Sequence, residues 1–345
     1  MARPKHAPPP SKWPIFHGDG RDPHDEIDHL PEPPPWRRFE SKLPAQPRDL
    51  QSLKHAKSWK QQLTLAQVYQ SDDDVIELVN AALLLRRPLL ISGPPGTGKS
   101  SLAYAVAHEL KLGPVLEWPI TTRSTVKDAL YGYDAIGRVY DQQRQKHKEQ
   151  DVPIGDYLRL GPLGTAMLPA ERPRVLLIDE IDKSDVDLPN DLLNIFEQGF
   201  FEIPELKREK LSEARVRVHD GDDFVTIHDG TVACRAFPFV ILTNNFEREF
   251  PQPFLRRCLR LEIAKPDKTK LTRIVKAHLG SQGETLTPAI SRIIDEFFER
   301  TQRREDLATD QLLNALYLTT SGGLDLLSDP RGKLRDAVWK SLSSG

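Results

Sequence analysis

The fold of this chain is decided by the stretch Gly93-Pro94-Pro95-Gly96-Thr97-Gly98-Lys99-Ser100, which completes the pattern G-x-x-x-x-G-K-[S/T]. The apolar run 88–92 precedes it, as a buried strand would, and residues 101–110 carry apolar side chains at helical spacing. Backbone N–H groups of such a loop, together with the positive end of the helix, form a concave anion site. A chance glycine-rich turn would lack this context, so the stretch predicts phosphate binding.

Different groups of this loop are expected to contact different parts of a nucleotide. Lys99 places a positive charge near the β- and γ-phosphates, and Ser100 offers its hydroxyl to Mg²⁺. The predicted nucleotide-binding residues are Gly93, Pro94, Pro95, Gly96, Thr97, Gly98, Lys99, Ser100 and Ser101.

An acidic motif distinguishes among the classes of nucleotide-binding protein. It is Arg174-Val175-Leu176-Leu177-Ile178-Asp179-Glu180-Ile181-Asp182, whose apolar residues predict a buried strand that ends at the carboxylates. We expect Asp179 to hold Mg²⁺ and Glu180 to orient or deprotonate an attacking water, which predicts hydrolysis. The alternative is that these are ordinary solvated charges, and this fits Asp182 better than the Asp179-Glu180 pair.

Two later segments extend the pattern. The apolar run 237–242 ends in Thr243-Asn244-Asn245, whose amides can contact the γ-phosphate or the water from between the two earlier motifs. The segment 253–258 contains an arginine pair ahead of another strand-like run, and an arginine there can stabilise transition-state charge. Each signal is weak alone, because strand-end asparagines are often turn formers and paired arginines are often solvated.

The four segments, taken in order, resemble the AAA+ ATPases. They are Gly-Pro-Pro-Gly-Thr-Gly-Lys-Ser at 93–100, Leu-Ile-Asp-Glu-Ile-Asp at 177–182, Leu-Thr-Asn-Asn at 242–245 and Phe-Leu-Arg-Arg-Cys at 254–258. Within that class the chain looks most like the MoxR-like group, through the segments 131–134, 160–163 and 187–193. The resemblance covers roughly residues 62–340.

The resemblance implies catalytic roles outside the phosphate loop. Glu180 would activate water, Asn245 would be the sensor with Asn244 beside it, and Arg257 or its neighbour Arg256 would be the arginine finger of an adjacent subunit. Ser100 and Asp179 would hold the metal. The chain departs from the pattern at the second sensor arginine. The lid helix begins 308–311 without an arginine, and the nearby substitutes are Arg303 and Arg304.

The predicted fold is α/β, a P-loop AAA+ parallel-sheet domain followed by a small all-helical lid domain. We expect a proline-rich arm at 1–60, a nucleotide-binding domain at 61–264 and a lid at 265–345. Connections longer than about 15 residues are uncommon in compact domains. Inserts near 119–173 and 201–236 are therefore expected.

Local patterns predict the remaining elements. A hairpin-like turn is expected near Leu160-Gly161-Pro162, and a hairpin where Asp220-Gly221 and Asp229-Gly230 flank 224–227. Further predicted elements are a helix at 72–85, a strand at 115–118 and lid helices at 270–279, 288–301, 309–319 and 333–342.

The N-terminal segment has a composition of its own. The first fifty residues hold twelve of the 29 prolines, which resist helix and sheet formation. Large apolar residues lie among them, so a docked arm and a mobile arm both stay open; they are Trp13, Ile15, Phe16, Trp36 and Phe39. The spacing of the local histidines matches no metal motif, which favours solvated or packed imidazoles; they are His6, His17, His24 and His29.

Composition narrows the function further. The chain has 48 Lys and Arg against 50 Asp and Glu, so no global positive field favours nucleic acid. Its two cysteines, Cys234 and Cys258, lack metal spacing and fit reduced structural thiols. No stretch approaches the length of a membrane span, and the N-terminus lacks an apolar leader segment, so we expect a cytoplasmic protein without membrane contact.

The resemblance implies a ring homo-oligomer, a hexamer, that binds ATP and Mg²⁺ between subunits and remodels or activates a client protein. A von Willebrand A domain protein is an expected partner. Two alternatives stay open: a nucleotide-gated assembly scaffold or switch with slow hydrolysis, and a nucleic-acid translocase or loader. The absence of an added DNA-binding motif makes nucleic acid the less favoured client.

Overall fold

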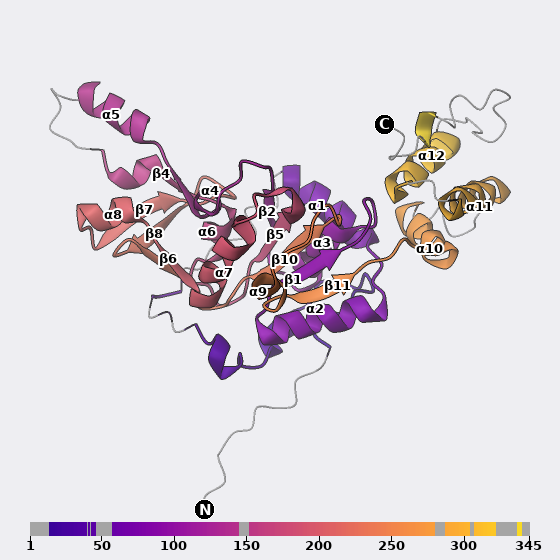
Figure 1. Cartoon of the computed structure of the whole chain (residues 1–345), viewed down its shortest axis with the longest axis horizontal. Coiled ribbons are helices and arrows are strands. Elements are labelled where there is room, and N and C mark those ends of the chain that lie inside the picture. The colour runs from indigo at the N-terminus through magenta and orange to yellow at the C-terminus, as the bar shows by residue number, and fades with distance from the viewer. Residues whose placement is uncertain are drawn as a thin grey trace, which may run out of the picture.

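The computed structural model describes residues 14–39, 41, 43–45, 57–144, 152–279, 287–303, 307–321 and 337–339. Trp13, Arg304 and most of the predicted helix 333–342 lie outside these residues. An α/β body forms the centre of the molecule, and a group of C-terminal helices lies at one end of it (Figure 1).

A five-stranded parallel sheet, the central sheet, confirms the predicted fold class. Its spatial order is β11-β1-β10-β5-β2, and every neighbouring pair is parallel. The predicted strands are all present, with bounds β1 (Leu89–Ser92), β2 (Leu116–Pro119), β5 (Val175–Asp179), β10 (Phe239–Asn244) and β11 (Leu259–Glu262). Most of their side chains are buried, as in a sheet covered on both faces.

Alternation along the strands divides the core between two faces of the sheet. Leu89 and Ile91 belong to one buried cluster and Leu90 to the other. The first cluster includes helices α2 (Asp73–Leu85) and α3 (Lys99–Glu109), and the second includes α6 (Pro162–Ala166) and α7 (Leu188–Gln198). Helix α1 (Lys57–Val68), which the sequence analysis did not predict, packs against α3.

The two predicted inserts meet in a second sheet, of order β3-β4-β7-β8-β9-β6. A parallel pairing of Arg159 with Arg217 joins a strand of the first insert to a strand of the second. The strands are β3 (Tyr131–Tyr133), β4 (Leu158–Leu160), β6 (Phe200–Glu202), β7 (Glu213–Arg217), β8 (Phe224–His228) and β9 (Thr231–Ala233). The other helices of the body are α4 (Val126–Leu130), α5 (Ala135–Arg144), α8 (Pro204–Glu209) and α9 (Gln252–Leu255).

One of the two predicted turns in the inserts is confirmed and one is wrong. Asp229 and Gly230 have φ of +48° and +59°, the left-handed pair that a tight hairpin turn between β8 and β9 requires. At residues 160–162 the chain instead passes from strand β4 into helix α6, with Pro162 in the first helical turn. A β-carbon on Gly161 would lie 2.3 Å from the Ala129 carbonyl oxygen, so close packing explains this glycine.

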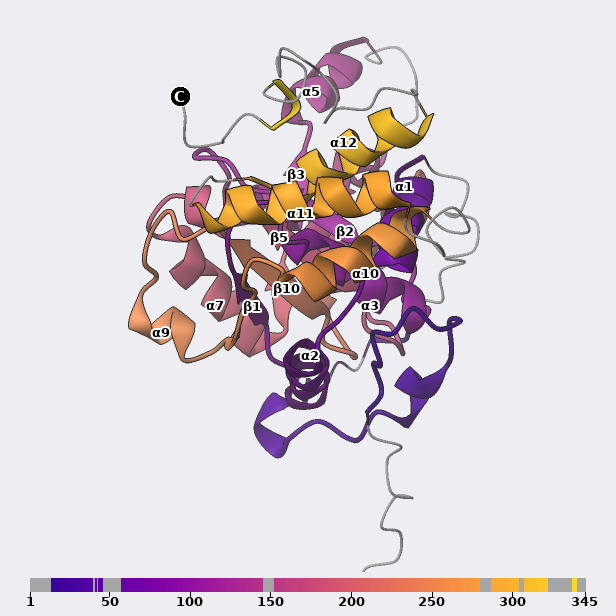
Figure 2. The same ribbon diagram turned by 90° about the vertical axis from the view of Figure 1, so that its right-hand side faces the viewer.

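Among the described residues after 266, three helices form the lid: α10 (Lys268–Leu279), α11 (Pro288–Gln302) and α12 (Thr309–Ser321). They bury an apolar cluster of their own that includes Trp339, the one described aromatic residue of the predicted last helix. In Figure 2 the lid helices face the viewer, and α10 contacts α1 of the body.

The N-terminal arm, described at 14–39, is docked on the body. Ile15 and Phe16 are fully buried against α2 and α3, where the Asn80 side chain accepts hydrogen bonds from both of their N–H groups at 2.8 and 2.9 Å. Phe39 stacks on Phe237 with 5.1 Å between ring centroids. Trp36 does not contribute to docking, because 75 % of it is exposed.

In the described part of the chain, no helix has both the length and the apolar character needed to cross a lipid bilayer.

Candidate functional site

The carboxyl ends of three neighbouring strands bring the predicted site residues together. β10 lies between β1 and β5, so the polar residues that end it stand between the phosphate loop and the acidic motif, as expected. Open α/β sheets bind ligands at this edge. The loop, the acidic motif and the asparagine pair therefore face one site.

The phosphate loop has the backbone shape that the glycines permit. Gly96 and Gly98 have φ of +72° and +84°, a region that favours glycine. Gly98 is the last residue before α3, so the loop N–H groups adjoin the positive end of that helix. Lys99 is buried here, and its Nζ donates hydrogen bonds of 2.8 Å to the carbonyl oxygens of Gly93 and Pro94.

Burial lowers the pKa of the Lys99 ammonium from its ordinary value, and the nearby carboxylates of Asp179, Asp182 and Glu180 oppose that shift. The nest of loop N–H groups beside Lys99 supplies an anion site where a phosphate could contact this cation.

Two oxygen atoms of the site have the spacing that a magnesium ion needs. Ser100 Oγ donates a hydrogen bond of 2.8 Å to Asp179 Oδ1. Adjacent ligands of an octahedral Mg²⁺ at about 2.05 Å lie about 2.9 Å apart. The hydroxyl and carboxylate therefore fit Mg²⁺ without moving their donor atoms apart.

Thr243, which the sequence analysis did not single out, organises the acidic motif. Its Oγ1 donates to Asp179 Oδ1 at 2.6 Å and accepts from the backbone N–H of Glu180 at 2.8 Å. A threonine next to the last position of a buried strand gives a weak sequence signal. Only the register of β10 against β5 shows that it lies beside the carboxylates.

Glu180 stands in a conformation that few non-glycine residues adopt. Its φ is +58°, which costs about 1 kcal/mol or more and occurs preferentially at functional sites. Its carboxylate accepts from Lys183 Nζ at 2.6 Å and from Asn245 Nδ2 at 3.4 Å. The hydrogen bond to Glu180 raises the pKa of Lys183. The predicted base and the predicted sensor thus touch each other.

Asp182 is not the solvated charge that the sequence analysis left open as an alternative. It is 5 % exposed, and its Oδ2 accepts from the backbone N–H groups of Asn245 at 2.7 Å and Glu247 at 3.2 Å. The carboxylate holds the chain after β10 against the acidic motif, which fixes the position of Asn245. The helical turn that follows Asp179 buries it, and local composition does not reveal this.

The two candidate sensor residues occupy different places. Asn244 is buried, and its Nδ2 donates to Ser92 Oγ at 3.1 Å, at the start of the phosphate loop. Asn245 is the residue whose amide reaches Glu180. The geometry favours Asn245 as the residue beside a lytic water.

A cavity of about 270 Å³ lies between the phosphate loop, α1 and the lid. Its size is near the lower end of small-molecule sites, roughly 300 Å³. One end is formed by Gly96, Thr97, Gly98 and Ser101, and the rest includes Leu65, Val68, Tyr69, Ile274 and Leu313. An apolar space next to an anion site suits a nucleotide base. The sequence analysis did not predict the wall of this cavity that α1 and the lid helices form, because no sequence motif marks those residues.

Neither arginine of the finger motif reaches this site within the chain. Arg256 and Arg257 are exposed after α9, and Arg257 Nε donates to Glu197 Oε1 at 2.8 Å. Arg257 also donates to the Pro253 carbonyl oxygen. The fold separates the predicted finger from the Glu180 that it would assist.

The second sensor position is occupied by other groups. Arg303 lies at the end of α11 and pairs with Glu299 on an exposed surface. Lys270 of α10 lines the cavity and forms an ion pair with Asp72. Among the described residues of the lid, Lys270 is therefore the better placed cation.

Comparison with known proteins agrees with this geometry. A family model described as an AAA domain of the dynein-related subfamily matches residues 88–258, which span β1 to the finger motif. No curated protein matches the chain significantly. Residues 88–258 therefore match an AAA domain, which supports an AAA+ ATPase with a phosphate loop.

Proposed function

We propose that this chain hydrolyses ATP at intersubunit sites of a ring and uses the energy to remodel a client protein, in the manner of the MoxR-like AAA+ group. The single observation that carries the ATPase part is the contact of Ser100, Thr243 and Asp179 beside Glu180. Metal ligands and a water-activating carboxylate then lie side by side next to the phosphate loop.

Each group of the site has a separate task in the proposed reaction. The loop N–H groups and Lys99 bind the β- and γ-phosphates, and the apolar cavity holds the base. Ser100 and Asp179 hold Mg²⁺, which supplies charge stabilisation to the phosphates when bound. Glu180 accepts a proton from the attacking water, and Asn245 orients that water and the carboxylate.

Ring assembly is proposed from the position of the finger motif. Arg257 is on an exposed surface, held by Glu197 rather than by its own phosphate loop. An arginine that assists hydrolysis from such a position must act on a neighbouring subunit. A ring places every Arg257 at the next site, and six subunits are the expected number.

A protein client is favoured by an exposed apolar face on the first insert. Helix α5 has no buried residue, and Ile136, Val139 and Tyr140 on it are more than half exposed. Exposed apolar side chains gathered at i, i+3 and i+4 often mark protein contacts. A von Willebrand A domain protein is the proposed partner on the resemblance to MoxR-like proteins alone.

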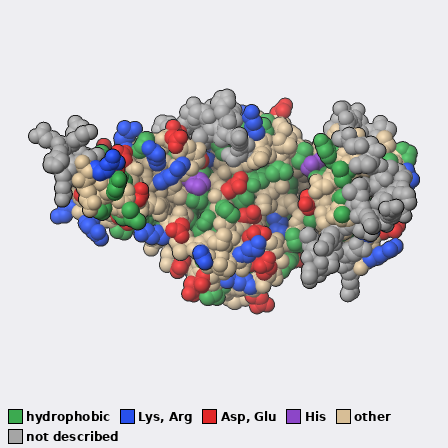
Figure 3. Space-filling model, turned by 90° about the horizontal axis from the view of Figure 1, so that it is seen from above, with side chains coloured by type: hydrophobic (Ala, Val, Ile, Leu, Met, Phe, Trp, Pro, Cys, Tyr) green, Lys and Arg blue, Asp and Glu red, His purple; other side chains and the backbone are tan. Residues whose placement is uncertain are grey.

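The nucleic-acid alternative has its own observation. Lys and Arg side chains gather at the end of the molecule that carries α5 and the second sheet (Figure 3). In α8 and β7 of this region, the exposed basic residues include Lys207, Arg208, Arg215 and Arg217. Stimulation of ATP turnover by DNA or RNA, with a steep loss on adding salt, would favour that function. If the client is a protein, the length of added DNA or RNA should have little effect on ATP turnover.

The test separates nucleotide binding from hydrolysis. Lys99→Ala is expected to abolish ATP binding, because the variant lacks the loop cation. Glu180→Gln is expected to bind ATP as the wild type does and to lose hydrolysis by about a hundredfold or more, the usual contribution of a general base. Binding is measured with a fluorescent ATP analogue, and hydrolysis by phosphate release.

Lys183→Ala is the matched control, because it removes the partner of Glu180 and keeps the carboxylate. Equal loss of ATP binding in Lys99→Ala and Glu180→Gln would contradict the assignment. Slow wild-type turnover that no candidate client raises, together with ATP-dependent assembly, would favour the switch over the remodelling ATPase.

A further inference from the structure

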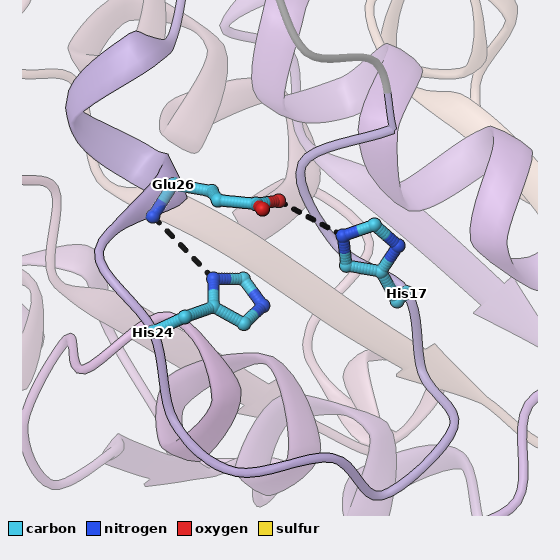
Figure 4. A group of neighbouring side chains, drawn as sticks. All are labelled: His17, His24 and Glu26. Atoms are coloured by element: carbon cyan, nitrogen blue, oxygen red, sulfur yellow. Dashed lines mark hydrogen bonds and ion pairs between the residues drawn. The ribbon is translucent and has the colours of Figure 1, made fainter.

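Outside the nucleotide site, the described residues contain one group of side chains with the donor set of a metal site. His17, His24 and Glu26 each offer a ligand atom, and the three atoms lie within 4.8 Å of one another. Figure 4 shows the two imidazoles and the carboxylate on a single loop of the N-terminal arm, directed toward a common space. The spacing in sequence matches no metal motif, so only the path of the docked arm assembles the group.

The hydrogen bonds around the cluster determine which imidazole nitrogen of His24 can bind an ion. The backbone N–H of Glu26 donates to Nδ1 of His24 at 3.4 Å, so the single lone pair of Nδ1 accepts a long hydrogen bond that a bound ion would displace. Nε2 of His24 therefore bears the proton, and it lies 3.2 Å from Glu109 Oε1. Metal-bound histidines commonly donate their second N–H to a carboxylate in this way.

Glu109 is placed to serve as such an outer carboxylate. It is 3 % exposed at the end of α3, and it also accepts from the backbone N–H groups of His17 at 2.6 Å and Gly18 at 2.9 Å. These contacts fix the backbone next to His17 and the ring of His24 at once. A buried carboxylate thus holds the loop in the shape that brings the three donors together.

We propose that His17, His24 and Glu26 bind a divalent transition-metal ion, with Zn²⁺ as the ion that best fits two imidazoles and one carboxylate. Zinc accepts these donors at about 2.0–2.2 Å and takes a water as its fourth ligand where the protein provides three. The His17 Nε2 and Glu26 Oε2 atoms lie 2.9 Å apart and share a proton. Zinc at His17 Nε2 takes the place of that proton, which moves to Nδ1 of the same ring, because a zinc-bound imidazole keeps one N–H.

Bound zinc would fasten the arm to the helix that begins at the phosphate loop. All three ligands lie on the arm, and Glu109 connects them to α3, whose first residues are Lys99 and Ser100. The ion would close the loop 17–26 and strengthen docking at that end of α3. This inference does not depend on the proposed client or on ring assembly.

The experiment is a zinc titration of the untagged full-length chain after chelator treatment, without nucleotide and in millimolar Mg²⁺. Magnesium prefers oxygen ligands, so it occupies carboxylate sites and leaves imidazoles available. Wild type is expected to bind one Zn²⁺ per chain, and His17→Ala and His24→Ala to bind at least about a hundredfold more weakly. His29→Ala, an exposed histidine in the same arm, is the matched control and should bind as wild type does.

Glu26→Gln guards against variants that fail to fold, since it keeps the side-chain shape and removes the charge. It should lower zinc affinity while leaving the unfolding temperature of the metal-free protein unchanged. X-ray absorption at the zinc edge should show nitrogen and oxygen at about 2.0 Å and no sulfur. Wild-type affinity equal to that of His17→Ala and His24→Ala, or a sulfur shell, would overturn the proposal and mark any bound zinc as adventitious.

Discussion

The nucleotide site and the N-terminal arm are built in opposite ways. The residues of the nucleotide site come in short contiguous motifs, each at the carboxyl end of a strand in the central sheet. The arm is a coil with two short 3₁₀ turns, at Glu26–His29 and Pro35–Arg37, and its contacts join residues far apart in sequence. Asn80 binds the backbone of Ile15 and Phe16, and Glu109 binds that of His17 and Gly18.

The difference shows which functional residues can be placed from the sequence alone. A strand end in a parallel sheet is a fixed place, so a carboxylate that follows a buried run has a predictable position. A coil has no such rule, and its partners depend on which surface it covers. Residues as ordinary as Asn80 and Arg37 carry the docking of the arm.

Arg37, near the end of the arm, shows how contacts with residues distant in sequence hold a coil segment on the body. Arg37 is buried, stands 5.0 and 4.7 Å from the ring centroids of Phe39 and Phe237, and donates to the Phe196 carbonyl oxygen at 2.9 Å. Burial lowers the pKa of this guanidinium from its ordinary value. The Glu197 carboxylate, 4.0 Å away, also holds Arg257, so the arm and the finger motif share a neighbour.

The largest expected effect concerns the nucleotide site and Arg257, which does not contact that site within its own chain. Arg257→Ala should leave ATP affinity nearly unchanged and lower hydrolysis by about a thousandfold, the lower end of finger contributions. Arg256→Ala is the neighbouring control and should retain most activity. Steady-state phosphate release at saturating ATP measures both.

Subunit mixing makes this test specific for a finger that acts between subunits. Arg257→Ala and Glu180→Gln chains, each inactive alone, should regain activity when mixed, because some sites combine an intact Glu180 with an intact Arg257 from the next chain. Undiminished turnover of Arg257→Ala as an isolated monomer would show that the finger is not needed.

The second effect concerns the arm. Phe16→Ala should lower the free energy of unfolding by about 3–5 kcal/mol, because it removes a fully buried ring from the cluster shared with α2 and α3. Trp36→Ala, which changes an exposed ring of the same arm, should change it by less than about 0.5 kcal/mol. Urea denaturation monitored by circular dichroism provides the measurement. Similar values for the two variants would mean that the arm does not contribute to the core.

The smallest effect concerns two buried thiols, one near the N-terminal arm and one next to the arginine finger motif. Cys234 lies close to Arg37 of the arm, and Cys258 directly follows Arg257. Burial raises the pKa of each thiol to about 12. The unfolded chain ionises these groups near pH 8.5, so their contribution to stability is complete below that pH and is lost as pH rises toward 12.

Between pH 8 and pH 10 the free energy of unfolding should therefore fall by roughly 1–2 kcal/mol per thiol. A Cys234→Ala/Cys258→Ala double variant should lose less stability over the same interval, and the difference in slope measures the thiols alone. Identical slopes would show that the thiols do not ionise on unfolding. If only Cys234 reacts with a thiol reagent in the folded protein, the arm opens independently of the nucleotide domain.

Several particular elements could be predicted from the sequence because they depend on local rules. The strands of the central sheet, the phosphate loop and the lid helices follow from apolar periodicity and from glycine, proline and charge at their ends. Helix α1 could not be recognised, because its weak amphipathic pattern gains stability from packing on α3 and from the Gln62 side chain, which accepts from the Val115 N–H at 2.9 Å. The prediction of a turn at Gly161-Pro162 was wrong, because the same dipeptide also begins helices.

By itself the sequence determined where the phosphate loop and the strand-end carboxylates stand in the chain, since these depend on residue type and on strand ends; the metal-binding and base roles of those carboxylates are predictions from the same pattern. Tertiary structure alone decided that Thr243 connects the acidic residues, that Asp182 is buried and that two distant inserts share one sheet. It also brought His17, His24 and Glu26 together. Strand register and coil docking are set by the whole folded core, and no local pattern specifies contacts between segments that meet only when that core forms.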